Sequence, residues 1–412
     1  MTIDPAASSG PRRIGRVLAR RPAGATGLLT LAFVSFIGLG LPEATLGVAW
    51  PAMRADLDLP VEALGLLLWA YTGGYLVAGA TAGRIGRRGG VGTVLWVAAA
   101  SSTLAMFGYV GAPSVALLLP AVAANGFGAG LIDTGLNAHL ALHHGPRAMN
   151  LLHASFSIGT TLGPLAAAGA LGAGVSWRWP YLAYAVLQAG LLAAFWRTRR
   201  SWSGTPIDHG GADAPPIRRR VALVMSLSLF FASTGVEAAI GAWSATLLVD
   251  GRGVSPGTAG LFVTTYWAGM TVGRVLLGIA GGRIDPRRTL GGSVVGVVAG
   301  TVVLWLDPAG LGVLGLPVAG LSIAGLFPAM VLLTPRRLGA DRIEAVMGWQ
   351  IAVAALGGAT VSAAIGVIAG PDVTRLAPGL AAAAILVAVL VVVAERVAPV
   401  GPPAAVSRAR SG

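Results

Sequence analysis

Two matching stretches of this chain lie about 200 residues apart. Residues 79–88 read GATAGRIGRR, and residues 278–288 read GIAGGRIDPRR. Each stretch follows a Trp-Ala pair, which begins at Trp69 in the first copy and at Trp267 in the second. The offset is 198 residues at the tryptophans and 199 residues at the first glycine of each stretch. The chain is therefore predicted to contain two copies of one structural unit.

Long apolar runs lie between and around these copies. The chain has 412 residues, of which 55% are hydrophobic and 11% charged, and the mean hydropathy is +0.76. About a quarter of the residues of a water-soluble domain are charged, so the composition excludes a soluble globular protein. A run of about 20 apolar residues crosses the hydrocarbon core of a bilayer as a helix. Such runs predict twelve helices, near residues 27–49, 61–82, 90–109, 114–140, 148–172, 178–197, 221–248, 257–280, 289–306, 311–333, 343–369 and 375–398.

The twelve predicted helices divide into two sets of six. A polar stretch rich in glycine, proline and arginine separates the sets. An even number of helices gives both halves the same topology, related by a pseudo-twofold axis along the membrane normal. We therefore expect an all-α integral membrane protein. Its predicted parts are a cytoplasmic tail at 1–26, a first half at 27–197, a cytoplasmic linker at 198–220, a second half at 221–398 and a cytoplasmic tail at 399–412.

The basic residues are distributed unevenly over the predicted loops. All 29 are arginines; 24 of them lie in the tails and loops on one side of the helices, and 4 lie on the other side. Short loops with positive charge stay in the cytoplasm, so both termini are predicted to be cytoplasmic. The net charge of +13 falls in short clusters between apolar runs, which indicates a lipid bilayer as partner and no nucleic acid. Arginine without lysine suggests a GC-rich genome, and we expect the inner membrane of a bacterium.

The first repeat also carries a family resemblance. The pattern at 79–88 resembles the loop signature of the major facilitator superfamily, although that signature has an acid where this chain has Gly83. Residues 128–137, GAGLIDTGLN, and residues 150–164, NLLHASFSIGTTLGP, are similar to helices 4 and 5 of the fucose-permease-like branch. The resemblance implies a transporter of twelve helices with a cavity between its halves. It also implies proton-coupled movement of a sugar or a sugar-like solute.

Three acids fall well inside the predicted helices, namely Glu43, Asp133 and Glu237. The first and third of them repeat the pattern Glu-x3-Gly, which ends at Gly47 and Gly241. A charge near the bilayer centre costs about 3 kcal/mol or more, so each acid should face the cavity or a partner. Burial favours the protonated form of a carboxyl, which suits a group that binds a proton on one side and releases it on the other. The branch resemblance makes Asp133 the preferred proton carrier. The simpler alternative for each acid is a neutral carboxyl that fixes helix packing by hydrogen bonds.

Further polar and aromatic side chains are placed to meet a solute. Amides and imidazoles bond hydroxyl groups, and flat aromatic rings stack on sugar faces. The candidates for solute binding are Asn137, His153, Trp243, Tyr266, Trp267 and Gln350. Each candidate has a structural alternative, which is hydrogen bonding between helices for the polar side chains and interfacial anchoring for the aromatic ones.

Charged residues near the repeats are candidates for a gate. Arg274 lies inside a predicted helix and needs a counter-charge there. An ion pair that breaks as the halves move and a permanent structural pair both satisfy that need. The two repeats supply the other gating candidates, which are Arg84, Arg87, Arg88, Arg283 and Asp285.

Motifs for other chemistry are missing from the sequence. There is no phosphate-binding loop, no zinc helix of the His-Glu-x-x-His type and no nucleophile elbow. Cysteine is absent, which excludes disulfides and thiolate metal sites. We therefore expect a monomeric transporter of a small solute and protons that has no enzyme activity, no cofactor and no metal. Two alternatives stay open: an exporter of drugs or secondary metabolites, and a membrane receptor that transports nothing.

Overall fold

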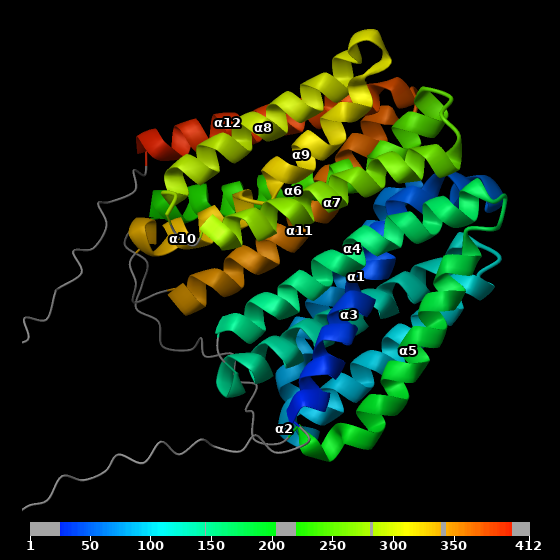
Figure 1. The fold of residues 1–412 in the computed structure, drawn as a ribbon, viewed down its shortest axis with the longest axis vertical. Helices are drawn as coiled ribbons and strands as arrows, with labels where there is room; N and C mark the ends of the chain where they lie inside the picture. The colour runs from blue at the N-terminus through cyan, green and yellow to red at the C-terminus, as the bar shows by residue number, and fades with distance from the viewer. Residues whose placement is uncertain (1–24, 145, 203–219, 281–282, 339–342, 398–412) are drawn as a thin grey trace, which may run out of the picture.

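The described part of the chain is built of α-helices (Figure 1). The computed structural model describes residues 25–144, 146–202, 220–280, 283–338 and 343–397. The predicted tails and most of the predicted linker at 198–220 lie outside these residues. The main helices are α1 (Ala25–Asp56), α2 (Ala63–Gly111), α3 (Val115–His143), α4 (Pro146–Gly172), α5 (Arg178–Thr198), α6 (Arg220–Thr246), α7 (Pro256–Ala280), α8 (Pro286–Leu306), α9 (Gly315–Ile323), α10 (Leu326–Leu338), α11 (Ile343–Ala369) and α12 (Leu376–Val397). Short helical turns lie between them, namely η1 (Arg199–Ser201), η2 (Leu247–Gly251), η3 (Pro308–Gly310), η4 (Gly312–Leu314) and η6 (Val373–Arg375).

All twelve predicted segments fall on helices of the structure, but their division into helices differs from the prediction in two places. Helix α2 has 49 residues and contains two predicted segments, with a break at Gly90, where φ is 72° and ψ is 174°. Residues with a Cβ atom rarely adopt this conformation, whereas glycine adopts it readily, so Gly90 allows the chain to break the helix there. The segment predicted at 311–333 is divided into α9 and α10 by a turn at Ala324 and Gly325.

The helices have the length and composition of membrane spans. Among the described residues, nine helical stretches are long and apolar enough to cross a bilayer, and α2 is one of them. Helices α5 and α7, with 21 and 25 residues, are also long enough to cross the ~30 Å hydrocarbon core. With α2 counted as two spans and α9–α10 as one, the chain is an all-α membrane protein of twelve transmembrane helices.

The connections between helices gather at two opposite ends of the bundle. At one end, Arg54 of α1 pairs with Asp250 of η2 at 2.7 Å. At the other end, Arg337 of α10 pairs with Glu395 of α12. We call the first the outer end and the second the inner end, following the predicted orientation. The loops alternate between these two ends, as an unbroken series of membrane crossings requires.

The two halves of the repeat form two helix groups that lie side by side. Figure 1 shows α1–α5 in blue to green and α6–α12 in green to red. The main helix pairs that join the groups are α1 with α6, α2 with α11 and α4 with α7. The last two of these pairs are the ones that flank the first, and they are equivalent in the repeat, because Trp69 of α2 corresponds to Trp267 of α7. The halves are therefore related by a pseudo-twofold axis that runs between α1 and α6.

The halves approach each other most closely at repeated glycines near the outer end. A Cβ atom on Gly47 of α1 would lie 2.2 Å from the carbonyl oxygen of Gly241 of α6. These two glycines end the two copies of Glu-x3-Gly, so positions that correspond in the repeat face each other. A second close approach joins α4 to α7, where a Cβ atom on Gly257 would lie 2.6 Å from the Cα atom of Gly172. Small residues thus let the helix backbones meet and close the outer end.

A side chain at Gly47 is expected to disturb this contact. Gly47→Ala forces α1 away from α6, and overpacking of this kind costs about 1–3 kcal/mol. The midpoint of thermal unfolding in detergent should fall by several degrees. Gly73→Ala is the matched control, because a Cβ atom on Gly73 of α2 meets no atom within 4 Å. Equal midpoints for the two variants would contradict the packing described here.

Candidate functional site

A large cavity lies between the two halves, inside the glycine contacts. Its volume is about 1790 Å³, and helices α1–α4, α6–α8, α10 and α11 line it. The lining extends to Arg147 and Ile284, which stand at the inner end. The opposite limit is Gly47 and Gly241, where the halves meet. The structure therefore has a central cavity that is closed towards the outer end and reaches the inner end.

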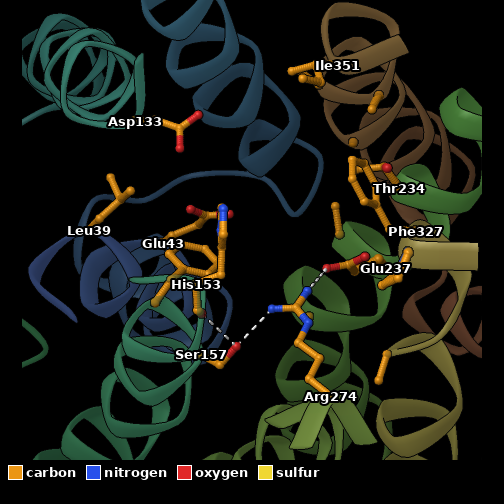
Figure 2. A pocket seen from close by; sticks show the side chains of 18 of the residues that line it. Leu39, Glu43, Asp133, His153, Ser157, Thr234, Glu237, Arg274, Phe327 and Ile351 are labelled. Carbon is orange, nitrogen blue, oxygen red and sulfur yellow. Dashed lines mark hydrogen bonds and ion pairs between the residues drawn. The ribbon is translucent and has the colours of Figure 1, made fainter. Parts of the chain in front are cut away.

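The three acids predicted from the sequence all line the central cavity. Figure 2 shows that they come from different helices: Glu43 from α1, Asp133 from α3 and Glu237 from α6. One acid therefore belongs to the second half and two belong to the first. The three acids lie 90 to 194 positions apart in the sequence, and the fold brings them to one cavity.

Two neighbours hold the carboxylate of Asp133. The hydroxyl of Tyr75 on α2 donates a hydrogen bond to Oδ2 at 2.6 Å. The side-chain amide of Asn137, one turn later on α3, donates to Oδ1 at 2.7 Å and to the backbone oxygen of Asp133 at 2.9 Å. Both donors lie in the first half. Asp133 is therefore fixed in place within that half while one side of it faces the cavity.

Glu43 is the most open of the three acids. Glu43 is exposed to the cavity, whereas Asp133 and Glu237 are half-buried. The hydroxyl of Tyr71 on α2 donates a long hydrogen bond to Oε2 of Glu43, at 3.4 Å. In Figure 2, the ring of His153 lies beside Glu43. Glu43 is consequently free to meet a molecule that enters from the inner end.

Glu237 has a cation beside it. Nη2 of Arg274 on α7 lies 3.8 Å from Oε1 of Glu237, and Nη1 of Arg274 donates a hydrogen bond to Oγ of Ser157 at 2.9 Å. Ser157 belongs to α4 of the first half. The backbone oxygen of Glu237 also accepts a hydrogen bond from the hydroxyl of Tyr266, at 2.9 Å. Arg274 thus satisfies the expectation of a counter-charge and connects the two halves (Figure 2).

The predicted solute-binding residues divide into two groups. Asn137, His153 and Trp267 line the central cavity. The other three are fully buried, and their polar atoms bond neighbouring helices. The indole N–H of Trp243 donates to the backbone oxygen of Ser362 at 2.8 Å, and the amide of Gln350 donates to Ser226 and Thr334 at 2.7 and 2.9 Å. Trp243, Tyr266 and Gln350 therefore take part in helix packing in this arrangement, and a solute-binding role for them stays a prediction.

The predicted gating residues of the two repeats lie at the inner end. The residues Arg84, Arg87, Arg88 and Arg283 are exposed. Asp285 begins α8, where its side chain accepts a hydrogen bond from the backbone N–H of Arg287 at 2.9 Å. Arg336 lies 4.0 Å from the same carboxylate. Asp285 is thus a helix cap in this arrangement, and a gating role for these five residues stays a prediction.

Histidines gather at the inner end of α3. The rings of His139 and His143 stack with centroids 4.5 Å apart, and the ring of Trp202 packs edge-on against His139 at 5.0 Å. Within the described ranges, neither this cluster nor the cavity acids form a group of three ligands placed to hold a metal ion.

Sequence reasoning missed several residues of the site. Ser157 was not among the candidates, because a hydroxyl on a membrane helix carries no pattern that shows which way it points. The Arg54–Asp250 pair was also missed, although the sequence held a signal for it. Arg54 follows Glu43 by 11 residues and Asp250 follows Glu237 by 13, so opposite charges stand at similar places in the two repeats.

Comparisons with known proteins agree with this architecture. The family model of the Major Facilitator Superfamily matches residues 28–227. An uncharacterized MFS-type transporter of Yersinia pestis is 26% identical over 344 residues, which are 82% of this chain and 85% of that protein.

Solved structures share the fold across both halves. A D-xylose–proton symporter superposes with a TM-score of 0.70 at 14% identity, covering 88% of this chain and 97% of its own. The transporter FucP in the outward conformation superposes with a TM-score of 0.61 at 14% identity, covering 89% and 98%. The family match over residues 28–227, the relative and the shared fold show that the chain is similar to members of the major facilitator superfamily.

Proposed function

We propose that this chain is a member of the major facilitator superfamily, moves a small, sugar-like solute by alternating access and couples that movement to protons. The observation that carries the proposal is the convergence of Glu43, Asp133 and Glu237 on one cavity between two halves. Carboxyls at membrane depth are costly and mark ion or proton pathways. A protein with this fold and no coupled solute would have no use for three of them. The proposal assigns transport to the chain and no catalysis.

Asp133 is the preferred proton carrier in this scheme. The hydrogen bonds from Tyr75 and Asn137 fix the carboxylate at the cavity wall, so a proton can reach it from the cavity without rearrangement of the helix. Asn137 and His153 face the same space and would bond hydroxyl groups of the solute. Trp267 offers an indole edge on the opposite wall. Two proteins with a similar fold are a D-xylose–proton symporter and the transporter FucP. Their names describe those two proteins, and they agree with the proposed transport of a sugar-like solute.

A second candidate function has one observation in its favour. Leucine, alanine and glycine make up much of the cavity lining, and about 1790 Å³ exceeds the roughly 300–1,000 Å³ of an ordinary ligand pocket. An apolar, roomy cavity would also suit a proton-driven exporter of larger amphipathic molecules, such as drugs or secondary metabolites. The two functions differ in the solute that elicits a pH change, and a solute screen separates them.

The proposed setting is the inner membrane of a bacterium, with both termini in the cytoplasm. The arginine distribution over the loops supports this orientation. The central cavity then faces the cytoplasm, and the structure represents the inward-open arrangement. The complete site lies within one chain, which supports a monomer as the functional unit.

Neutralising the proposed proton carrier is expected to abolish coupling. Wild-type protein in proteoliposomes should make the outside medium alkaline when its sugar is added, because solute and proton enter together. Asp133→Asn keeps the size of the side chain and loses the titrating group, so the pH change should disappear. The measurement is the fluorescence of an external pH dye during a screen of sugars and cationic drugs.

Asp58→Asn is the matched control for this assay. Asp58 is exposed at the outer end with φ of 52°, a conformation that asparagine also adopts readily. Coupled flux that survives in Asp133→Asn would move the proton to Glu43 or Glu237. Uptake without any pH change would indicate uniport, and no flux of any tested solute would favour the receptor alternative.

Removing the ion pair between Arg54 and Asp250 is expected to favour opening of the outer end. Arg54 and Asp250 come from different halves and are only 24% and 22% exposed. A pair of this kind contributes up to about 1 kcal/mol, so Asp250→Asn should raise the population open to the outside by up to about fivefold. The measurement is the rate at which a membrane-impermeant maleimide labels Leu68→Cys from outside.

The reporter and its control follow from the structure. Leu68 lines the cavity one turn inside Gly65, which packs on Ala363 at the outer contact, and the chain has no other cysteine. The charge swap Arg54→Asp with Asp250→Arg should restore the wild-type rate. Equal labelling of Asp250→Asn and wild type would show that the pair does not hold the outer end closed.

A further inference from the structure

Ser157 connects the first half to the charged pair of the second. Its side chain is 1% exposed, and its Oγ accepts the hydrogen bond from Nη1 of Arg274 at 2.9 Å. The hydroxyl of Ser157 donates in turn to the backbone oxygen of His153 at 3.3 Å. Figure 2 shows Arg274 between Ser157 on one side and Glu237 on the other. The guanidinium is thus shared between a residue of each half.

The two contacts of Arg274 are unequal. The distance of 2.9 Å to Ser157 is that of an ordinary hydrogen bond. The distance of 3.8 Å to Glu237 is too long for one, although opposite charges still attract at that range. A guanidinium and a carboxylate that meet without constraint form hydrogen bonds of about 2.7–2.9 Å. In this arrangement, therefore, Arg274 is hydrogen-bonded to the first half and stands back from the acid of its own half.

Threonines fix the height at which Ser157 meets α7. The hydroxyl of Thr271, one turn before Arg274, donates to the backbone oxygen of Ser157 at 3.2 Å. The hydroxyls of Thr161 and Thr271 lie 3.1 Å apart across the same interface. These contacts continue the α4–α7 packing from the glycines of the outer end into the cavity. Ser157 and Arg274 are consequently held opposite each other by the register of the two helices.

We propose that Ser157 is a positioning residue for proton coupling. It holds Arg274 away from a close ion pair with Glu237 in the inward-open arrangement and releases it when the halves move. Glu237 and Arg274 lie in one half, whereas Ser157 lies in the other, so movement of the halves changes only the Ser157 contact directly. A proton on Glu237 and a close ion pair with Arg274 exclude each other. Ser157 would thus link proton occupancy to the position of the halves. The idea rests on the proposed proton-coupled transport.

Other titratable groups face the same pair. Glu43 of α1 and His153 of α4 approach from the first half, and Tyr266 of α7 lies beside Glu237. Asp133 of α3 lines the same cavity. All of them stay unchanged when Ser157 is replaced. A response to pH that belongs to these groups therefore survives in a Ser157 variant, and only the part that passes through Arg274 is lost.

The test uses the pH dependence of conformation, measured without any solute. Right-side-out membrane vesicles carry the Leu68→Cys reporter, and an impermeant maleimide is applied from outside in acidic to alkaline buffers. The labelling rate is divided at each pH by that of Val175→Cys, which is exposed at the outer end, because maleimide reacts with the thiolate and its rate rises with pH. For the wild type this ratio is expected to change by roughly tenfold over the range, because a hydrogen bond to a charged group sets the equilibrium. Ser157→Ala and Glu237→Gln should each lose most of this change. Ser157→Thr, which keeps the hydroxyl, should retain it.

Two comparisons make the test specific. Ser155→Ala is the matched control, because Ser155 lies on the same helix and bonds only its own helix backbone, at Leu151, among its described contacts. The double variant Ser157→Ala with Glu237→Gln should behave as Glu237→Gln alone, since both changes act on one contact.

Three results would overturn the proposal: a wild-type ratio of labelling rates that does not vary with pH, a Ser157→Ala profile equal to that of Ser155→Ala, or additive effects in the double variant. The failure of proton-coupled transport is a separate result, because the labelling assay requires no flux. If Ser157→Ala left the pH profile unchanged while coupled flux was intact, only this inference would be contradicted.

Discussion

The packing of Gly47 against Gly241 is the contact on which the rest of the structure depends. A side chain on Gly47 would meet the backbone of α6, so the outer ends of the two halves close in this way only because residue 47 is a glycine. The two glycines are equivalent in the repeat and therefore lie at the pseudo-twofold axis. The glutamates that precede them by four residues come to lie one turn further in, at the closed end of the cavity. One repeated motif thus supplies both the closure and two of the three acids.

The charged side chains do not follow the pseudo-twofold symmetry of the backbone. Glu43 has a tyrosine hydroxyl at 3.4 Å, whereas Glu237 has an arginine at 3.8 Å that is also bonded to the other half. Asp133 adds a third carboxyl that is held within the first half. A symmetric scaffold gives two halves that can exchange arrangements. In the proposed function, the asymmetric charges would give each arrangement a different demand for protons.

The sequence predicted the fold well because its signals are periodic and long. Apolar runs, arginine clusters and the repeat at 79–88 and 278–288 each mark helix ends, and the twelve segments follow. The acids of the cavity were also predictable, since a carboxyl at membrane depth requires a partner or a cavity. The direction in which each side chain points was not predictable from the sequence. Trp243 and Gln350 turn into helix packing, while Ser157, which no pattern singled out, reaches Arg274.

The most direct test of the account is whether the two ends of the bundle move in opposite senses. Spin labels on a chain without cysteines can be placed at Val175 and Thr374 for the outer end and at Arg88 and Arg288 for the inner end, all of them exposed. Distances from pulsed electron resonance are then compared between acidic and alkaline buffer. Alternating access predicts that the outer distance lengthens as the inner distance shortens. Two distances that stay fixed, or that change together, would contradict alternating access around the glycine contact.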